Sequence, residues 1–240
     1  MMRSIKSWLH DHPYSYALFY FIPYLIIFEL LETFVVPKYY IHCFIDDMIP
    51  FHESFVIPYF TWFPLLAISL CYFLFHSRKE FLELCFMMFT GMSICLFIYM
   101  ILPNGLDLRV NITHTNWLAD IARLLQQIDT PTNVCPSIHV ASTIAICFVV
   151  CRSHLFQHPF LVKSACLIIS VFICISTMVL KQHSFIDVIL GFALSSLLYY
   201  VTYHTNWQKY FMKTPLRILF SYIRTTIEND QFFDLLHHRT

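Results

Sequence analysis

The chain has 240 residues, of which 58% are hydrophobic and 12% are charged, and its 15 basic residues balance its 15 acidic ones. Soluble domains carry roughly 50% apolar and about 25% charged residues, so this composition excludes an ordinary soluble protein. The zero formal net charge gives no indication of a nucleic-acid partner.

The apolar residues form six runs that are each long enough to cross the roughly 30 Å apolar core of a bilayer as a helix. The predicted spans are residues 15–36, 54–75, 81–102, 137–153, 160–180 and 184–203. One helix covering the last two runs would be about twice as long as the core is thick, so the chain is expected to turn near Lys181, Gln182 and His183. These runs predict an all-α polytopic membrane protein with six transmembrane helices in one bundle.

The orientation of the bundle follows from its lysine and arginine residues, which resist translocation. If the N-terminus is cytoplasmic, eleven of them lie in inner segments, and the outer segments hold only four, namely Lys38, Arg109, Arg123 and Lys181. We therefore expect a plasma-membrane protein with both termini in the cytoplasm. Residues 1–208 would form the catalytic membrane domain, and residues 209–240 would form a cytoplasmic tail that is either amphipathic or disordered.

Most of the nine cysteines lie in or beside apolar runs, where cysteine acts as a small hydrophobic side chain. Only Cys43 and Cys135 fall in segments expected outside the membrane. A disulfide between these two is chemically possible, but their spacing does not predict one.

Three polar segments are expected to meet at the outer face of the membrane, namely residues 102–109, 136–139 and 181–183. Ionisable side chains at this depth are costly unless they serve a site. The predicted site, within residues 102–190, therefore brings together His139, His183, Asp187, Lys181 and Arg109.

His183 and Asp187 are four residues apart, so in the first turn of a helix they would share one face. The carboxylate would then bind one ring nitrogen and leave the other free as a nucleophile. Alternatively, Ser184 and Asp187 form a capping pair at the start of the helix, and both interpretations can hold together.

Two motifs in this region resemble those of the type 2 phosphatidic acid phosphatase superfamily. Its second motif, Pro-Ser-Gly-His, corresponds to Pro136-Ser137-Ile138-His139. Its third motif, a Ser-Arg pair followed after five residues by His and after three more by Asp, corresponds to Ser176-Thr177, His183 and Asp187. The resemblance covers the third to sixth predicted spans, and it covers the first two mainly by topology.

The chain departs from the family pattern at its cations. The first motif, Lys-x6-Arg-Pro, keeps Arg109, but Leu102 stands at the lysine position and Val110 at the proline position. In the third motif Thr177 replaces arginine, while Lys181 lies four residues later and would reach the site if the fifth helix continued that far.

The resemblance implies a mechanism that uses no metal and no cofactor. His183 would attack phosphorus, Asp187 would orient His183, His139 would protonate the departing alkoxide, and water would then release phosphate. The phosphate would be bound by a further set of residues, namely Arg109, Ser137, Lys181 and Thr177.

Three functions remain open from the sequence. The first is hydrolysis of a lipid phosphate monoester or pyrophosphate drawn from the bilayer, such as phosphatidate, a phosphatidylglycerophosphate or a polyprenyl pyrophosphate. The second is phosphotransfer to an alcohol acceptor, as in sphingolipid synthases, and the third is a non-catalytic membrane scaffold or transporter. The sequence predicts no oligomeric state.

Three weaker signals accompany the site. Glu29 and Glu32 lie in the outer half of the first span, where they would either pair with a site cation or face interfacial water. Residues 46–51 would either line the outer mouth or form an ordinary interfacial loop. Residues 118–128 have apolar side chains at helical spacing and predict an interfacial helix.

Overall fold

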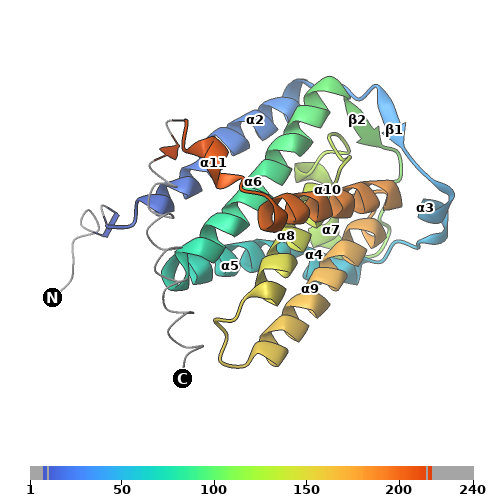
Figure 1. The fold of residues 1–240 in the computed structure, drawn as a ribbon. Helices are drawn as coiled ribbons and strands as arrows, with labels where there is room; N and C mark the ends of the chain where they lie inside the picture. The colour runs from blue at the N-terminus through green and yellow to red at the C-terminus, as the bar shows by residue number, and fades with distance from the viewer. Residues whose placement is uncertain (1–7, 10, 215, 218–240) are drawn as a thin grey trace.

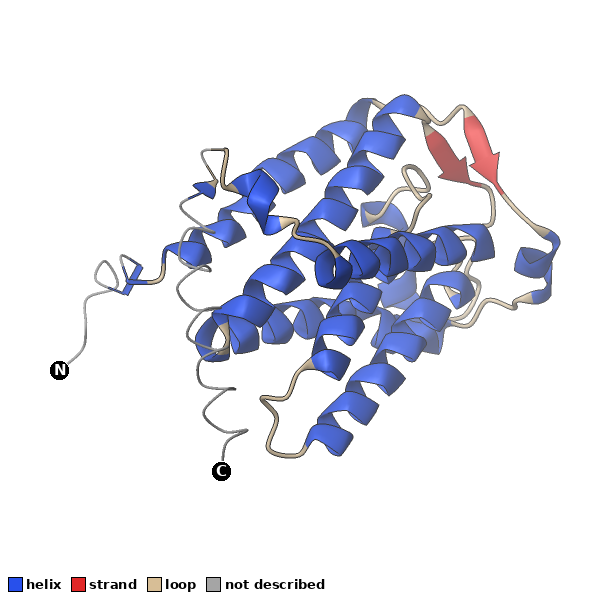
Figure 2. Cartoon of the chain, in the orientation of Figure 1, coloured by secondary structure: helices blue, strands red, loops and turns tan. Residues whose placement is uncertain are grey.

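The computed structural model of the protein describes residues 8–9, 11–214 and 216–217 (Figure 1). Helices make up most of this part of the chain (Figure 2). In chain order the elements are η1 (Pro13–Tyr20), α2 (Phe21–Phe34), β1 (Tyr39–Ile41), α3 (Phe44–Met48), η2 (Glu53–Phe55), α4 (Val56–Phe60), α5 (Trp62–His76), α6 (Arg78–Ile101), β2 (Asn104–Leu106), α7 (Trp117–Ile128), α8 (Ile138–Arg152), α9 (Pro159–Val179), α10 (Phe185–His204) and α11 (Gln208–Phe211).

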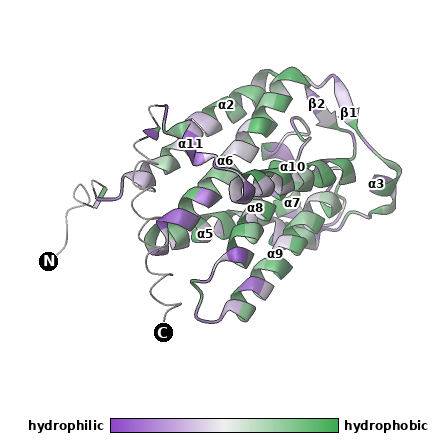
Figure 3. Ribbon diagram, in the orientation of Figure 1, coloured by the Kyte–Doolittle hydropathy of each residue, from purple (hydrophilic) through white to green (hydrophobic). Residues whose placement is uncertain are grey.

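Five helical segments are long and apolar enough to cross a membrane, and most of their residues are hydrophobic (Figure 3). They are Pro13–Phe34, Glu53–His76, Arg78–Ile101, Pro159–Val179 and Phe185–His204. The predicted sixth span, residues 137–153, forms α8, which has only 15 residues. A helix of that length rises about 22 Å, which is less than the thickness of the bilayer core. Five of the six predicted spans are therefore long enough to cross a membrane, and the sixth is not confirmed.

The helices pack unevenly around α6. More than half of the most apolar window of α6 is buried, because α6 packs against α8, α10, α5 and α2. Only 11% of the corresponding window is buried in the first spanning segment, which contains α2. The core of the bundle is therefore built around α6 and α8, and α2 lies at its edge (Figure 1).

A small cap covers one end of the bundle. Strands β1 and β2 pair in parallel, with Tyr39 opposite Asn104 and Ile41 opposite Leu106, beside the end of α6 (Figure 1). This short pair is an addition to the predicted all-α fold. Helix α7 confirms the helix predicted over 118–128, and it begins where the Asn116 side chain accepts a hydrogen bond from Ala119 N at 2.9 Å.

The structure describes only the start of the predicted tail. Helix α11 lies there, and its Phe211 ring packs edge-on against Trp207. Residues 215 and 218–240 lie outside the described residues, so the prediction of an amphipathic or disordered tail over 209–240 is not tested.

Candidate active site

The chain turns between α9 and α10 at the predicted place. Helix α9 ends at Val179, and Lys181 adopts a positive φ of 58°. The carbonyl of Thr177 accepts hydrogen bonds from the amides of Gln182 and His183, at 2.9 and 3.0 Å. The fifth helix therefore ends before Lys181. Lys181 was expected to reach the site only if this helix continued that far, so the condition is not met.

The start of α10 sets the positions of His183 and Asp187. Ser184 is the N-cap, its amide donates to Asp187 Oδ2 at 2.8 Å, and the predicted capping pair is confirmed. His183 lies just before the helix, so the two residues do not share its first turn. The ring nevertheless approaches the carboxylate, with 3.4 Å between His183 Nδ1 and Asp187 Oδ2.

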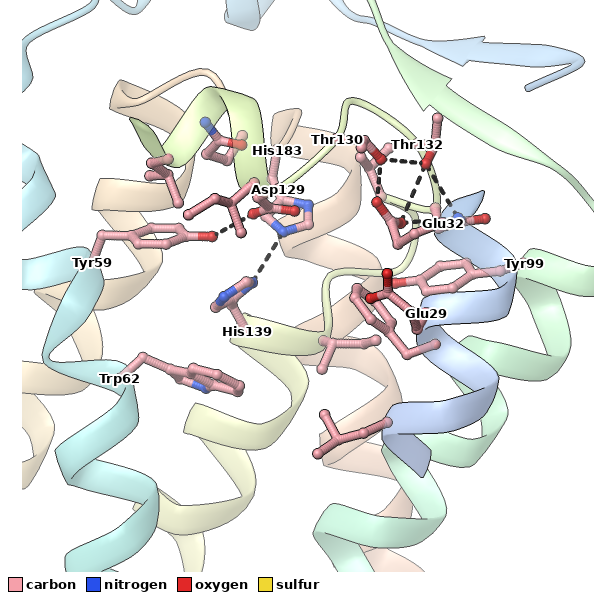
Figure 4. Close-up of a pocket in the computed structure, with 18 of the residues that line it drawn as sticks. Glu29, Glu32, Tyr59, Trp62, Tyr99, Asp129, Thr130, Thr132, His139 and His183 are labelled. Carbon is pink, nitrogen blue, oxygen red and sulfur yellow. Dashed lines mark hydrogen bonds between the residues drawn. The ribbon is translucent and has the colours of Figure 1, made fainter. Parts of the chain in front are cut away.

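His139 meets His183 from a different helix. Ser137 caps α8, which places His139 in its first turn, and His139 Nδ1 lies 3.4 Å from His183 Nε2 (Figure 4). The amide of Ser137 donates to the carbonyl of Asp187 at 3.1 Å, which joins the starts of α8 and α10. The three residues expected to carry the chemistry therefore lie together, although their roles stay predictions.

Two aromatic rings flank His139. Its ring centroid is 4.5 Å from that of Trp62 and 4.8 Å from that of Tyr59. Trp62 Nε1 donates to Ser142 Oγ at 2.8 Å, and Tyr59 OH donates to Asp129 Oδ2 at 2.8 Å. Both rings are therefore fixed by hydrogen bonds at the edge of the site.

The two histidines open onto a cavity of about 730 Å³ between α2, α4, α5 and α7. This volume is typical of a site for a small organic molecule or a lipid head group. Its lining combines aromatic rings with polar groups, including Tyr24, Phe28, Tyr59, Phe60, Trp62, Phe63, Tyr99, Glu29, Glu32, Asp129, Thr130, Thr132, Asn133, His139, Gln182 and His183.

The two predicted phosphate-binding cations point elsewhere. Lys181 Nζ donates to the carbonyl of Asp46 at 2.6 Å. Arg109 donates to the carbonyls of Gln126 and Asp129 and, at 3.0 Å, to Gln182 Oε1. Burial lowers the pKa of Arg109, but arginine remains charged near neutral pH. Neither cation belongs to the lining of the cavity, and their phosphate-binding role stays a prediction.

The other two predicted phosphate ligands have structural partners. Ser137 is fully buried, and its hydroxyl oxygen accepts a hydrogen bond from Val140 N at 3.3 Å. Thr177 is also fully buried, and its hydroxyl donates to the carbonyl of Cys174 at 2.8 Å. Both residues shape the ends of helices beside the histidines.

Asp46 anchors the turn that carries His183, a role that the sequence did not reveal. Asp46 is 2% exposed, and its carboxylate accepts hydrogen bonds from Ser184 Oγ at 2.6 Å and from Phe185 N at 2.7 Å. Burial alone raises the pKa of Asp46, but the hydrogen bonds from Ser184, Phe185 and Cys43 outweigh it and lower the pKa. Neither of the two interpretations of residues 46–51 included contact with the turn that carries His183.

Asn104 plays the corresponding role for the segment before His139. Its Oδ1 accepts from the amides of Val134 and Cys135 at 2.9 and 2.8 Å, and its Nδ2 donates to the carbonyls of Leu102 and Cys135. The position of Asn104 beside a Pro, at the end of an apolar run, was the only signal available in the sequence.

Glu32 joins α2 to the loop after α7. Its carboxylate accepts hydrogen bonds from the hydroxyls of Thr130 and Thr132 and from Asn133 Nδ2, the last two at 3.2 and 3.0 Å (Figure 4). Among the described residues, the hydrogen-bond partners of Glu32 are these neutral donors and not a cation of the site. Glu29 is exposed and also lines the cavity.

Cys43 and Cys135 are both free thiols, so the disulfide left open by the sequence is absent. Within the described ranges, no group of three or more His, Cys, Asp and Glu side chains is arranged to hold a metal ion.

Comparisons of the chain with family models, with curated proteins and with solved structures found no match.

Proposed function

We propose that the protein is a membrane enzyme that cleaves a phosphate ester of a lipid through a histidine nucleophile. The observation that carries the proposal is the His139–His183–Asp187 arrangement at the cavity, with 3.4 Å between the facing nitrogens of the two imidazoles. Tertiary structure alone brings the two histidines together, since they are 44 residues apart in the chain.

In this proposal each of the three side chains has one role. Because Asp187 lies beside Nδ1 of His183, Nε2 is the nitrogen that faces His139 and attacks phosphorus. The bond from phosphorus to the lipid oxygen breaks, and His139 protonates that oxygen. Water then attacks the phosphohistidine and His139 accepts its proton, so both histidines return to their starting states.

The contact between the two imidazoles is too short to hold phosphorus between them. Substrate binding therefore requires the rings to separate, and the adjoining cavity gives them and the phosphate group room. In-line displacement places the nucleophile and the departing oxygen on opposite sides of phosphorus. This fits two imidazoles that come from separate segments, the turn before α10 and the first turn of α8.

In this proposal the short helix α8 is the sixth crossing, and the site faces outward from the plasma membrane. Helix α8 runs beside α6, α9 and α10 and would need local thinning of the bilayer or help from flanking residues to span it. The distribution of lysine and arginine supports cytoplasmic termini, as described above.

Transfer to an alcohol is the second candidate. It uses the same His183 intermediate and differs only in whether water or an acceptor hydroxyl attacks it. Polar groups on the α2 side of the cavity, including Thr130 and Glu32, could bind the hydroxyl of an acceptor alcohol. This observation favours phosphotransfer as the second candidate.

The test is release of phosphate or a phosphorylated head group from lipid esters by the purified protein in detergent, with a chelator present. We expect wild-type activity that survives the chelator, an acid-labile phosphoprotein after quenching, and loss of both in His183→Ala. His204→Ala, which changes a histidine at the far end of α10, is the control. Equal activity of His183→Ala and wild type would contradict the proposal.

A further inference from the structure

The cavity carries a charge pattern that a phosphate monoester does not explain. Three carboxylates line it, from Glu29, Glu32 and Asp129, and no lysine or arginine is among the described residues of its lining. A dianionic phosphate placed there would be repelled and would have no facing cation. The lining fits a ligand that brings its own positive charge.

The carboxylates lie to one side of the histidines. Figure 4 shows Glu29 and Glu32 projecting from α2, while Tyr59 and Trp62 lie on the other side of His139. The two glutamates are one helical turn apart and share a face. A ligand with its phosphorus at His183 and an extension toward α2 would therefore present that extension to two carboxylates.

An unpaired acceptor lies beside the glutamates. Asn133 is 4% exposed and lines the cavity, and its Nδ2 donates to Glu32 and Thr132. These donations fix the orientation of the amide, and its buried Oδ1 has no hydrogen-bond partner. A buried acceptor without a donor is costly, and a ligand that donates a hydrogen bond to this atom would remove that cost.

A primary ammonium group satisfies all three observations. It carries one positive charge and three N–H donors, which match the carboxylates and the free amide oxygen. A neutral hydroxylated head group would supply donors but would leave the carboxylates without a counter-charge.

We infer that the substrate is a phosphodiester lipid whose head group ends in a primary ammonium, and that Glu29 and Glu32 bind this ammonium. The inference rests on the proposed function. His183 attacks phosphorus, the bond to the lipid oxygen breaks, and that oxygen takes a proton from His139. Water then attacks phosphorus and the bond from phosphorus to His183 Nε2 breaks, which releases the phosphorylated amino alcohol. The proton lost by the water passes to His139, so no further reactant is needed.

The decisive experiment compares three lipids with the same acyl chains, namely phosphatidylethanolamine, phosphatidylglycerol and phosphatidate, with chelator present. Released head groups are quantified by mass spectrometry for wild type, His183→Ala, Glu29→Gln and the Glu29→Gln/Glu32→Gln double variant. Glu29→Gln is included because it leaves the bonds of Glu32 to the 130–133 loop in place. Asp120→Asn, which changes an exposed carboxylate of α7 outside the cavity, is the matched control.

We expect His183-dependent release of phosphoethanolamine, with kcat/KM at least about tenfold above that for the other two lipids. That preference should fall about tenfold in the double variant, fall less in Glu29→Gln and stay unchanged in Asp120→Asn. His183-dependent turnover of phosphatidate or phosphatidylglycerol in preference to phosphatidylethanolamine would overturn the inference and leave the proposed function standing. An unchanged preference in the double variant would also overturn the inference and leave the proposed function standing. If no lipid shows His183-dependent turnover, both the inference and the proposed function are wrong.

Discussion

The two sides of the cavity are built differently. On the histidine side, α8 and α10 start next to each other and are joined by the bond from Ser137 N to the carbonyl of Asp187. On the other side, α2 belongs to a segment whose apolar window is only 11% buried, and Glu32 ties it to the loop after α7. His183, the proposed nucleophile, thus sits in a buried hydrogen-bond network, and the groups that would select the head group sit on a sparsely packed helix.

From this difference we expect some substitutions to alter the reaction and others to alter substrate selectivity. Changes around His139, His183 and Asp46 should lower turnover of every substrate, because they act on the reacting groups or on their positions. Changes at Glu29 and Glu32 should alter the ranking of substrates while leaving the reaction itself intact.

The largest loss of activity is expected on substitution of His139. His139→Ala should lower kcat roughly 10²- to 10⁴-fold on a lipid ester, because the alkoxide would leave without a proton. An aryl phosphate ester, whose leaving group needs no proton, should lose much less activity. Steady-state kinetics on the two substrates measure this difference, and an equal loss on both would remove the assignment of His139 as the acid.

Asp46 should give the next largest effect, although it does not touch the cavity. Asp46→Asn weakens the bonds to Ser184 and Phe185 that hold the start of α10. A displacement of His183 near 1 Å would lower kcat up to about 10²-fold with little change in KM. Asp47→Asn, at the exposed neighbouring carboxylate, is the control. A change confined to KM would argue against a positioning role.

Gly191 tests how closely the histidine side is packed. A Cβ at this position would lie 2.8 Å from the carbonyl oxygen of Ser137 and 3.1 Å from Val140 Cβ. Gly191→Ala should therefore push α10 from the start of α8, destabilise the protein by about 1 to 3 kcal/mol and lower activity on all lipids alike. Thermal unfolding and the three-lipid assay measure this, and wild-type stability would show that the helices separate without cost.

The smallest expected effect is a pH dependence of stability. Because its pKa is lowered in the folded protein, Asp46 stabilises the fold above its unfolded pKa of about 3.9, and this contribution is lost as pH falls through the lower folded value. The difference in Tm between wild type and Asp46→Asn should therefore be largest near neutral pH and shrink toward pH 3. Unfolding followed in detergent across this range checks it, and a constant difference would mean that Asp46 acts without its charge.

Local patterns in the sequence predicted the spanning helices and the start of α10. Long apolar runs predicted the spanning helices, because burial of apolar side chains follows run length, and the spacing of Ser184 and Asp187 predicted the cap of α10. Residues 136–139 and 183–187 also predicted that His139, His183 and Asp187 would meet at one end of the bundle. Helix α8 is shorter than the predicted span because the length of an apolar run does not fix where a helix ends.

The partners of the charged groups depend on the packing of segments that are distant in the chain. Asp46 bonds to Ser184 across 138 residues of chain, and Glu32 bonds to Asn133 across 101, so no local pattern could have revealed either contact. The same contacts turn Lys181 toward Asp46 and leave the cavity lined by carboxylates. Buried polar groups take whichever partner the packing of distant helices brings near, because an unpaired one is costly, and that packing is a property of the whole chain.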